Sequence, residues 1–290
     1  MKRFWKISVA AVLGLIMLTA VGCGGKTEPP KTTPAASGQP AEQKAEAGGP
    51  KIKEIKQRGK LIAGVKYDIP LFGFLDPKDQ QVKGFDVDVA RMIAKELFGD
   101  ENKVELKQVK SADRIAALQQ NDVDVVVATM TINDERKKQI DFSNTYYFAG
   151  MSLTAKKGSG IKKVEDLAGK KVAAVKGANS GPNLEKLAKD KNVKGLTIDL
   201  YPTYPEAIAA VKAGRAVAAA TDNIIGAGFV QEDKNLELVG GLLTDEPYGV
   251  GLKKGNDDLV KFVNGVIEKG MKNGELKKLA EKWQVPWDTK

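Results

Sequence analysis

Short apolar runs alternate with helix-like patterns along the chain from Lys60 onward. The run at 61–65 is typical of a buried strand, and Val89, Met92 and Ile93 then recur at the spacing of one helix face. Strands that alternate with helices predict parallel sheets with right-handed crossovers, which is the α/β class. On this pattern we expect strands at 61–65, 104–109, 123–128, 171–175, 196–200, 217–220 and 236–239, and helices at 89–97, 115–118, 184–187, 207–211, from 222 onward, and at 257–283.

Two places interrupt this alternation. Around 148–155 and around 247–252, extended segments follow one another without a helix between them. We interpret both as connections between two lobes, so that the chain leaves the first lobe near Ala149 and returns near Glu246. The alternative is a single continuous sheet. The two-lobed interpretation assigns residues 51–149 and 246–290 to lobe 1 and residues 150–245 to lobe 2, with a cleft where the chain crosses.

The stretch 123–142 joins a predicted strand directly to a predicted helix start. Its Val-rich first part predicts a strand buried on both faces, and two hydroxyl residues, Thr129 and Thr131, follow. Asn133 then stands as a helix N-cap, with two acidic residues and Arg136 after it. This order places the threonines and Arg136 at the carboxyl end of a parallel strand, where open α/β sheets bind ligands. The pattern favours an anion site suited to a carboxylate; the alternative is that Arg136 caps a surface turn and the threonines only satisfy backbone groups.

The N-terminal segment has the pattern of a secretory signal. Three positive charges in its first residues precede an apolar stretch from Ile7 to Val21, which is short for a transmembrane span. The tail Ala20-Val21-Gly22-Cys23 resembles a bacterial lipobox, in which the cysteine is lipidated, although leucine is more usual at the position of Ala20. We therefore assign residues 1–22 to a lipoprotein signal peptide and expect a lipid anchor, such as palmitate, on Cys23. The alternative is cleavage elsewhere, with a free cysteine left over.

Residues 23–50 follow as a predicted disordered tether that begins at the lipidated cysteine. Gly24 to Pro50 hold five prolines and no aromatic or large aliphatic residue, so this segment buries too little surface to offset its ordering entropy. As a flexible coil it reaches about 30 Å. Such a reach suits a domain held near a membrane surface.

The composition excludes several function classes. The formal net charge is +9, and removal of Lys2, Arg3 and Lys6 with the signal, which holds no acid, leaves +6. The basic residues are spread evenly without an aromatic–basic patch, so we expect no nucleic-acid partner. Histidine is absent and Cys23 is the only cysteine, which excludes histidine-dependent triads, an intramolecular disulfide, and zinc sites built on histidine or several thiolates. We expect neither a metal nor a cofactor.

Several ordered motifs lie between Lys60 and Trp283. They are Gly84-Phe85-Asp86-Val87-Asp88-Val89-Ala90, the block from Thr129 to Phe142, Tyr146-Tyr147, Asp166-Leu167-Ala168-Gly169-Lys170, Ala213-Gly214-Arg215, Thr221-Asp222-Asn223 and Asp245-Glu246-Pro247-Tyr248-Gly249. In these motifs the chain resembles the bacterial extracellular solute-binding proteins of family 3, which deliver polar amino acids to ABC importers. The resemblance implies a periplasmic-binding-protein-like fold, in which two α/β lobes joined by two hinge strands enclose the ligand when they close.

The resemblance places the α-carboxylate of an amino acid against Arg136. The guanidinium would hold it as a two-pronged ion pair, assisted by Thr129 and Thr131, because a planar guanidinium matches carboxylate geometry. Asn179 or Ser180, in the loop that opens a lobe 2 helix, would add a contact to the same carboxylate. That loop departs from the usual Gly-Thr-Thr or Gly-Ser-Thr pattern of the family.

The other pole and the side chain of the ligand are assigned in the same way. Asp222 would accept the α-ammonium, although by itself it also fits a helix N-cap. Lys66 stands where many relatives carry Asp, and Ser111, Arg114 and Tyr204 match residues that face the side chain in the acidic-amino-acid branch; Lys66 and Arg114 also fit ordinary solvated charges. The ligand-binding residues implied are Lys66, Phe85, Ser111, Arg114, Thr129, Thr131, Arg136, Asn179, Tyr204 and Asp222.

Charge then favours an acidic ligand side chain. Lys66, Arg114 and Arg136 against Asp222 give a site near +2, and enclosing an uncompensated cation costs several kcal/mol. Glutamate or aspartate is therefore the first choice and glutamine the second, since Asp68 is a further acid that could rebalance the site. Basic amino acids are disfavoured.

The resemblance implies an extracytoplasmic substrate-binding component of an ABC importer. The protein would be a monomer, lipid-anchored on the periplasmic side or the outer cell surface, that delivers a free L-amino acid to the transmembrane permease subunits and their ATPase. It would not be an enzyme. Two alternatives share the fold: a secreted dehydratase of prephenate-like acids, and a ligand-sensing module, which would continue into a transmembrane helix and a signalling domain beyond Trp287.

Overall fold

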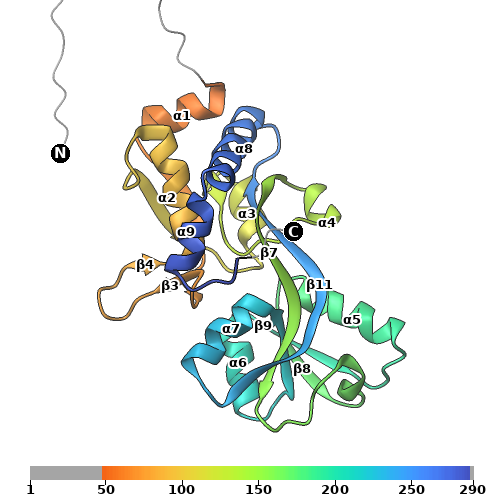
Figure 1. Cartoon of the computed structure of the whole chain (residues 1–290). Coiled ribbons are helices and arrows are strands. Elements are labelled where there is room, and N and C mark those ends of the chain that lie inside the picture. Colours follow the sequence, from red (N-terminus) through yellow and green to blue (C-terminus); the bar gives the residue numbers. More distant parts are fainter. Residues whose placement is uncertain (1–47, 288–290) are drawn as a thin grey trace, which may run out of the picture. The chain divides into compact units, whose positions relative to one another are not determined.

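The computed structural model describes residues 48–287, which form one eight-stranded sheet and one three-stranded sheet. The strands of the large sheet follow the order β5-β1-β6-β11-β7-β10-β8-β9, and Figure 1 shows helices packed around both ends of it. The expected signal peptide, Cys23 and most of the expected tether lie outside the described residues. Within 48–287, the helices are all too short or too polar to cross a membrane.

Lobe 1 is the part built on β5, β1 and β6. Strand β1 pairs in parallel with both β5 and β6, as expected for strands joined by helical crossovers. The pattern of apolar positions on α2 explains its place, because Val89, Ile93 and Leu97 are buried against the sheet. The elements of lobe 1 are β1 (Leu61–Val65), β5 (Val104–Gln108), β6 (Val125–Val126), α1 (Pro50–Arg58), α2 (Phe85–Phe98), α3 (Arg114–Gln119), α4 (Asp134–Lys137), α8 (Asp257–Lys272) and α9 (Glu275–Lys282).

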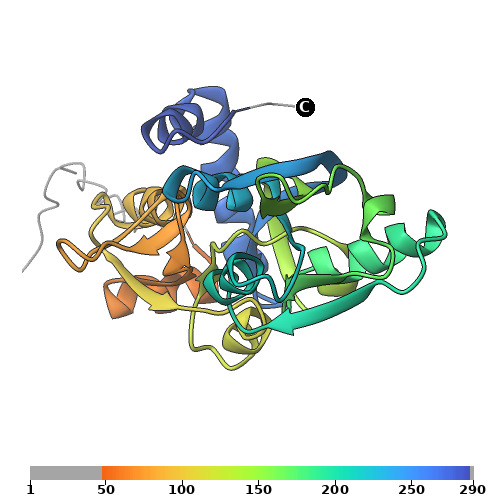
Figure 2. The ribbon, with the colours of Figure 1, turned by 90° about the horizontal axis from the view of Figure 1, so that it is seen from below.

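Lobe 2 is the part built on β10, β8 and β9. Strand β8 pairs in parallel with β9 and β10, so this lobe repeats the α/β construction of lobe 1. Figures 1 and 2 both place its helix α5, in green, away from α8 and α9, in dark blue. The elements are β8 (Lys171–Val175), β9 (Thr197–Tyr201), β10 (Ala218–Asp222), the 3-10 helix η1 (Val164–Leu167), α5 (Ser180–Asp190), α6 (Tyr204–Lys212) and α7 (Asn223–Glu232).

Two long antiparallel strands run through both lobes (Figure 1). They are β7 (Asp141–Lys156) and β11 (Leu236–Leu252). Their pairing is irregular between Val239 and Thr244, where Gly240 and Gly241 have positive φ values of 86° and 67°. Strand β7 pairs with β10 of lobe 2, and β11 pairs with β6 of lobe 1. Because β7 and β11 also pair with each other, one hydrogen-bonded sheet runs through a two-lobed molecule.

A small antiparallel sheet, β2-β3-β4, is formed by the part of the lobe 1 sequence that connects β1 to α2. Its strands have two or three residues each, which is too short for the two-residue alternation of a strand to stand out. The apolar pattern therefore did not predict it. The strands are β2 (Asp68–Ile69), β3 (Gly73–Leu75) and β4 (Val82–Lys83).

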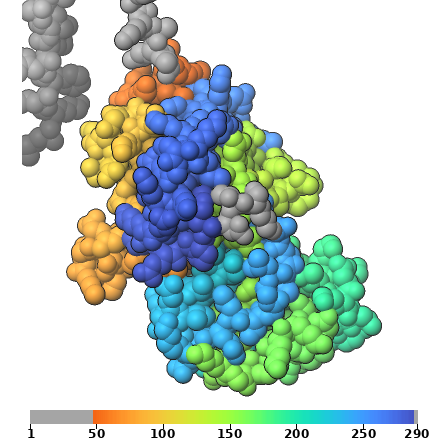
Figure 3. Space-filling model, in the orientation of Figure 1, coloured from red at the N-terminus to blue at the C-terminus, as the bar shows by residue number. Residues whose placement is uncertain are grey.

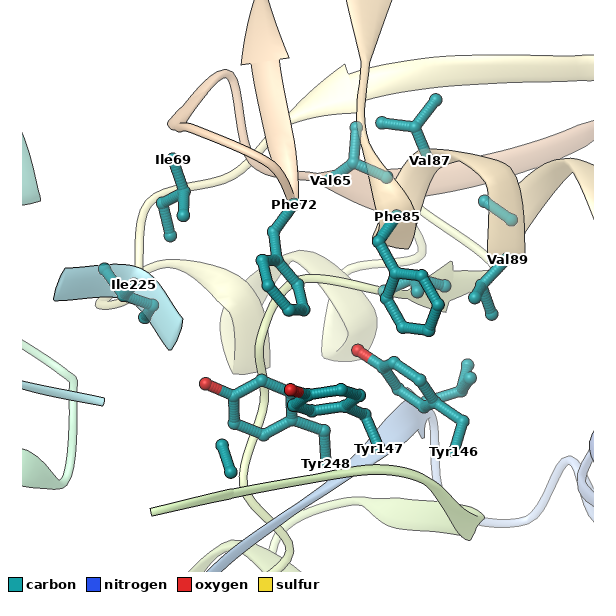
Figure 4. Close-up of a cluster of buried hydrophobic side chains, with 14 of the residues drawn as sticks. Val65, Ile69, Phe72, Phe85, Val87, Val89, Tyr146, Tyr147, Ile225 and Tyr248 are labelled. Carbon is teal, nitrogen blue, oxygen red and sulfur yellow. The ribbon is translucent and has the colours of Figure 1, made fainter. Parts of the chain in front are cut away.

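An aromatic cluster forms part of the largest core of buried residues between 48 and 287 (Figure 4). The ring centroid of Phe72 lies 5.6 Å from those of Phe85 and Tyr147 and 6.2 Å from that of Tyr248, with the rings edge to face. Ile225 of α7 belongs to the same buried cluster. The core therefore contains side chains from both lobes.

Most of the expected elements are present, and their ends differ by one to a few residues. The strand expected at 171–175 coincides with β8, whereas the one expected at 123–128 is reduced to β6. The segments at 148–155 and 247–252 are parts of β7 and β11. The helical stretch at 257–283 divides into α8 and α9 around Gly274, whose φ is 75°.

Candidate ligand-binding site

Arg136 lies in the short helix α4 after β6. Asn133 caps this helix as predicted, because its Oδ1 accepts the backbone N–H of Arg136 at 2.9 Å. The guanidinium donates to the carbonyl of Thr131 at 2.7 Å and to the carbonyl of Gly177 in lobe 2 at 3.2 Å. Burial lowers the pKa of Arg136, and the negative charge of Asp222 acts in the opposite direction. Arg136 is thus a buried cation that reaches from lobe 1 to lobe 2.

Thr129 and Thr131 are both buried, but their hydroxyls have different partners. The backbone N–H of Thr129 donates to Asp86 Oδ2 at 2.7 Å, and its hydroxyl donates to the carbonyl of Ala128 at 2.8 Å. The hydroxyl of Thr131 donates to Asn179 Oδ1 in lobe 2 at 3.3 Å. Thr131 therefore joins the lobes, whereas the Thr129 hydroxyl serves its own backbone.

Arg114, at the start of α3, is held by backbone carbonyls. Its Nη1 donates to the carbonyls of Ala128 at 2.7 Å and Thr129 at 3.2 Å, and its Nη2 donates to that of Gly177 at 3.3 Å. Burial lowers the pKa of Arg114 to about 10, and the positive charge of Arg136 acts in the same direction. Arg114 and Arg136 thus converge on one carbonyl of lobe 2, and two buried cations so close together make the position attractive to an anion.

Lys66 follows β1 and is 1% exposed. Its Nζ donates to the hydroxyl of Ser111 at 2.8 Å, so two of the four residues predicted for the side-chain pocket are in contact. Burial lowers the pKa of Lys66 to about 7, and the charge of Arg114 lowers it further, while Asp68 and Asp86 oppose the shift. Lys66 is therefore not a solvated surface charge.

Asp86, in the first turn of α2, is fully buried and was not assigned a role from the sequence. It accepts hydrogen bonds from the backbone N–H of Thr129 and, at 2.8 Å, from the hydroxyl of Tyr146. Burial raises its pKa to about 7 against these bonds and the charges of Arg114 and Lys66. The signal in the sequence is a pair of acids, Asp86 and Asp88, within an otherwise apolar helix start.

Asp222 ends β10 immediately before α7 and is 3% exposed. The hydroxyl of Tyr248 donates to its Oδ2, and its side chain makes no cap hydrogen bond to α7. Burial raises the pKa of Asp222 to about 7, the charge of Glu246 adds to the rise, and Arg136 is among the groups that oppose it. A cation placed beside this carboxylate would lower its pKa, so the site suits an ammonium group.

Asn179 and Glu246 form a second polar group at the start of α5. The side-chain amides of Asn179 and Asn183 both donate to the Glu246 carboxylate, the latter at 2.9 Å, and the hydroxyl of Thr244 donates to it at 2.6 Å. Glu246 is 1% exposed and was also assigned no role from the sequence. The hydroxyl of neighbouring Ser180 is buried and has no hydrogen-bond partner within residues 48–287.

Tyr204 opens α6, where Thr203 and Glu206 form a capping box. It is 4% exposed, and its pKa is raised by burial and by the charge of Asp222, against Arg114. Its hydroxyl is therefore kept neutral among the charged groups of the site.

Phe85 lies in the aromatic cluster of Figure 4 and is fully buried. Its ring centroid is 5.7 Å from that of Tyr147 and 6.3 Å from that of Trp287. These contacts give Phe85 a packing function, and its expected contact with a ligand stays a prediction.

The structure thus brings the predicted residues other than Phe85 into one buried polar region between the lobes. On the face shown in Figure 3 the surfaces of the lobes meet. The sequence-based charge near +2 counted one acid; the structure adds two buried acids beside the cations, so that the formal charges balance. The cations are Lys66, Arg114 and Arg136, and the carboxylates are Asp86, Asp222 and Glu246.

Neither a metal site nor the large surface pocket of the described residues adds to this region. No group of three or more Cys, Asp, Glu or His side chains in residues 48–287 is placed to hold a metal ion. A surface pocket of about 1190 Å³ between α8 and the first residues of β7 is lined by Ile140, Phe142, Val260 and Asn264, among others. It contains none of the predicted ligand-binding residues.

Comparisons with known proteins agree on one family. Residues 61–286 match the family model for bacterial extracellular solute-binding proteins, family 3. The chain is 40% identical over 284 residues to the ABC transporter glutamine-binding protein GlnH of Bacillus subtilis, covering 98% of this chain and 97% of that protein. It is 41% identical over 256 residues to the glutamine-binding protein of Geobacillus stearothermophilus, covering 87% and 94%, and 31% identical over 250 residues to the glutamate/aspartate import solute-binding protein of Salmonella typhimurium, covering 84% and 82%.

Solved structures with the same fold include an ancestral arginine-binding protein bound to glutamine. It is 40% identical in sequence, has a TM-score of 0.71, and covers 78% of this chain and 98% of that one. The solute receptor for L-cysteine of Neisseria gonorrhoeae has a TM-score of 0.74 at 31% identity, covering 80% and 92%. These matches confirm the expected two-lobed, periplasmic-binding-protein-like fold.

Proposed function

The chain belongs to the bacterial extracellular solute-binding proteins of family 3, and from this premise we propose that its ligand is L-glutamine. It is the substrate-binding component of an amino acid importer of the ABC class. Two relatives named as glutamine-binding proteins are 40% and 41% identical to it, against 31% for one named for glutamate and aspartate. This difference supports glutamine ahead of the acidic amino acids.

The two poles of the amino acid would be bound by opposite charges from the two lobes. The α-carboxylate would accept from the guanidinium of Arg136, the hydroxyl of Thr131 and the start of α5, where the buried Ser180 hydroxyl is available. The α-ammonium would donate to Asp222, whose other hydrogen bond comes from Tyr248. Both ends of the ligand then hold the lobes together.

The observation that carries the choice of glutamine is the charge balance of the buried site. Asp86 and Glu246 offset the cations that the sequence left uncompensated. Glutamine brings no net charge into this balanced region, whereas glutamate brings one negative charge and would have to be desolvated with it. Lys66, Ser111 and Tyr204 offer a donor and two hydroxyls to the side-chain amide.

Glutamate is the second candidate because of Lys66 and Arg114. Burial lowers the pKa of both, so either cation would gain from a nearby carboxylate. This was the basis of the sequence-based preference for glutamate or aspartate. Glutamate comes second because the buried acids Asp86 and Glu246 already offset these cations.

The experiment is a thermal-shift panel of the twenty amino acids on the mature chain, followed by calorimetry on those that protect it. A ligand at one hundred times its dissociation constant adds about 2.7 kcal/mol to the free energy of unfolding. We expect glutamine to bind most tightly, and Asp86→Asn to move the preference toward glutamate by leaving a net positive charge. Tighter binding of glutamate by the unmodified protein would replace glutamine, and no protection by any amino acid would reject the assignment.

We further propose that binding involves no chemical step. The polar groups of the site are engaged with one another or suited to the poles of a zwitterion, and the relatives named above are binding proteins. A dehydratase on the same fold would consume prephenate. A rise in ultraviolet absorbance as prephenate is converted to an aromatic product in the presence of the protein, or chemical change in glutamine recovered after incubation, would contradict this proposal.

The cellular location is proposed from the sequence and the family. Cys23 would carry the lipid anchor, residues 24–50 would tether the domain, and residues 51–149 with 246–290 and 150–245 would form two lobes of a monomer. Labelling with palmitate in cells should mark the protein, and Cys23→Ser should abolish the label and release the protein from membranes. Retention of the label in that variant would move the anchor elsewhere.

A further inference from the structure

We propose that Gly177 and Gly228 are positioning residues for lobe closure, because the absence of a side chain at each lets lobe 2 approach the backbone of lobe 1. This inference rests on the proposed function, since it concerns the state that holds the ligand. Both glycines belong to lobe 2, one before α5 and one within α7. In Figures 1 and 2 these two helices lie on different sides of that lobe.

Gly177 makes the closer of the two contacts. A Cβ added to it would lie 2.5 Å from Ala112 Cα, 2.6 Å from Ala112 N and 2.7 Å from the carbonyl carbon of Ser111. All three atoms are backbone of lobe 1, so no side-chain rotation relieves the overlap. An L-residue at this position therefore forces the two backbones apart.

The same contact delivers the carbonyl of Gly177 to both arginines of the site. Arg114 Nη2 donates to it at 3.3 Å and Arg136 Nη2 at 3.2 Å. Both guanidiniums come from lobe 1 and the acceptor from lobe 2, so these bonds form only as the lobes approach. Closure at Gly177 thus fixes the orientation of the groups that face the ligand carboxylate.

Gly228 makes a second contact between the lobes. A Cβ added there would lie 3.0 Å from both the Cβ and the carbonyl oxygen of Pro70, in the turn between β2 and β3. Nearby, Ile69 of lobe 1 and Ile225 of α7 belong to one buried cluster (Figure 4). A methyl group at Gly228 would have to be accommodated by a slight opening of the lobes.

The test compares Gly177→Ala and Gly228→Ala with two matched controls in the mature chain. Gly214 has a φ of 72°, similar to the 79° of Gly177, and an added Cβ meets nothing within 4 Å. Gly265 lies within helix α8 as Gly228 lies within α7, and its Cβ position is also open. Gly214→Ala and Gly265→Ala therefore reproduce the backbone effects without the contact between the lobes.

We expect Gly177→Ala to weaken amino acid binding by about tenfold to one hundredfold and Gly228→Ala by about fivefold to tenfold. The loss should appear as faster dissociation with an unchanged association rate, since the contacts form after the ligand has been captured. Gly228→Ala should keep or raise the melting temperature without ligand, because alanine favours a helix over glycine. The control variants should bind within about twofold of the unmodified protein.

A distance measurement between spin labels separates this inference from the ligand assignment. Labels on Lys53→Cys in α1 and Lys189→Cys in α5, in a Cys23→Ser background, report the separation of the lobes. With saturating ligand, both test variants should show a longer mean distance than the controls. If no amino acid binds, the proposed function fails, and closure is judged from the minor population of short, closed label distances in the free proteins, which should be smaller in both variants than in the controls. Affinities and distances equal to those of the controls would overturn the inference.

Discussion

Thr129 has a backbone conformation that β-branched residues seldom adopt, with φ at 46°. Its N–H donates to the buried carboxylate of Asp86, and its carbonyl accepts from Arg114. The turn after β6 thus connects an acid and a cation of the site through the backbone of one residue. At the residue scale, the site thus depends on individual buried charged groups, each held by the few hydrogen-bond partners around it.

The left-handed backbone at Thr129 predicts an inverted order of stability for two substitutions. We expect Thr129→Gly to be more stable than Thr129→Ala by about 1 kcal/mol, because an L-residue is strained at positive φ and glycine is not. Thr145, in strand β7, is the control, and there the glycine variant should be the less stable of the two. Urea denaturation measures all four proteins; the same order at both positions would mean that Thr129 is not strained.

Asp86 predicts a dependence of stability on pH. Its pKa is about 7 in the folded protein against an ordinary value near 4. The folded state therefore binds the proton more tightly, so the contribution of Asp86 to stability is full below about pH 4 and is lost as pH rises through about 7. We expect the free energy of unfolding to fall by about 3–4 kcal/mol from this group over that range.

Asp86→Asn isolates this contribution. Asp222, whose pKa is also raised to about 7, acts in the same direction in both proteins, and the lowered pKa of Lys66 acts mainly above pH 7. The measurement is urea denaturation at pH 5 and pH 7, without ligand. A decline between these pH values that is equally steep in the variant and the unmodified protein would contradict the assignment.

At the scale of elements, the C-terminal helix α9 is attached to α2 through one carboxylate. Asp88 is 6% exposed and accepts from Lys282 Nζ and Trp283 Nε1, each at 2.7 Å, and from Arg91 at 3.2 Å. Lys282 also lies over the Trp283 ring at 5.3 Å from its centroid. The end of α9 is thereby attached to α2.

Asp88→Ala should lower the free energy of unfolding by about 1–3 kcal/mol, because it strands the indole N–H and removes a partly buried ion pair. Asp190→Ala is the control, since Asp190 is 54% exposed and pairs with Lys186, which is 76% exposed. That change should alter stability by less than about 1 kcal/mol. Tryptophan fluorescence during urea denaturation reports both, and equal losses in the two variants would remove the special role of Asp88.

At the scale of the whole molecule, the charged groups of the site are divided between the two lobes. Within the described residues, the chain passes between the lobes only along β7 and β11, which also join the two halves of the large sheet. Arg136 and Asp222 come from different lobes, as do the hydrogen-bond partners Thr131 and Asn179. A zwitterion bound at both poles therefore has a higher affinity for the closed arrangement than for a separated one. Only such a difference in affinity can shift a population toward closure.

Arg136→Ala should weaken amino acid binding by about 2–5 kcal/mol, because it leaves the ligand carboxylate buried without its partner. Arg215→Ala changes an exposed arginine of lobe 2 and serves as the control, with an expected change below about 0.5 kcal/mol. Calorimetry measures the affinity, and small-angle scattering measures whether ligand still compacts the protein. Unchanged affinity in Arg136→Ala would remove this residue from the carboxylate site.

Much of this protein follows from its sequence alone. The α/β class, the order of strands and helices, the Asn133 cap and the grouping of Thr131 and Arg136 after a buried strand depend on neighbours within a few residues, which periodicity and capping chemistry report. The small sheet β2-β3-β4 did not follow, because its strands are too short to show a period.

The charge of the site was decided by tertiary structure. Asp86 reaches Thr129 and Tyr146 across 43 and 60 residues of sequence, and Glu246 reaches Asn179 across 67. No local pattern indicates which acids will be buried beside which cations, because that depends on how the strands of two lobes align. Composition supplied the charged residues; the packing of the lobes determined which of them neutralise one another, since only burial makes their mutual compensation energetically necessary.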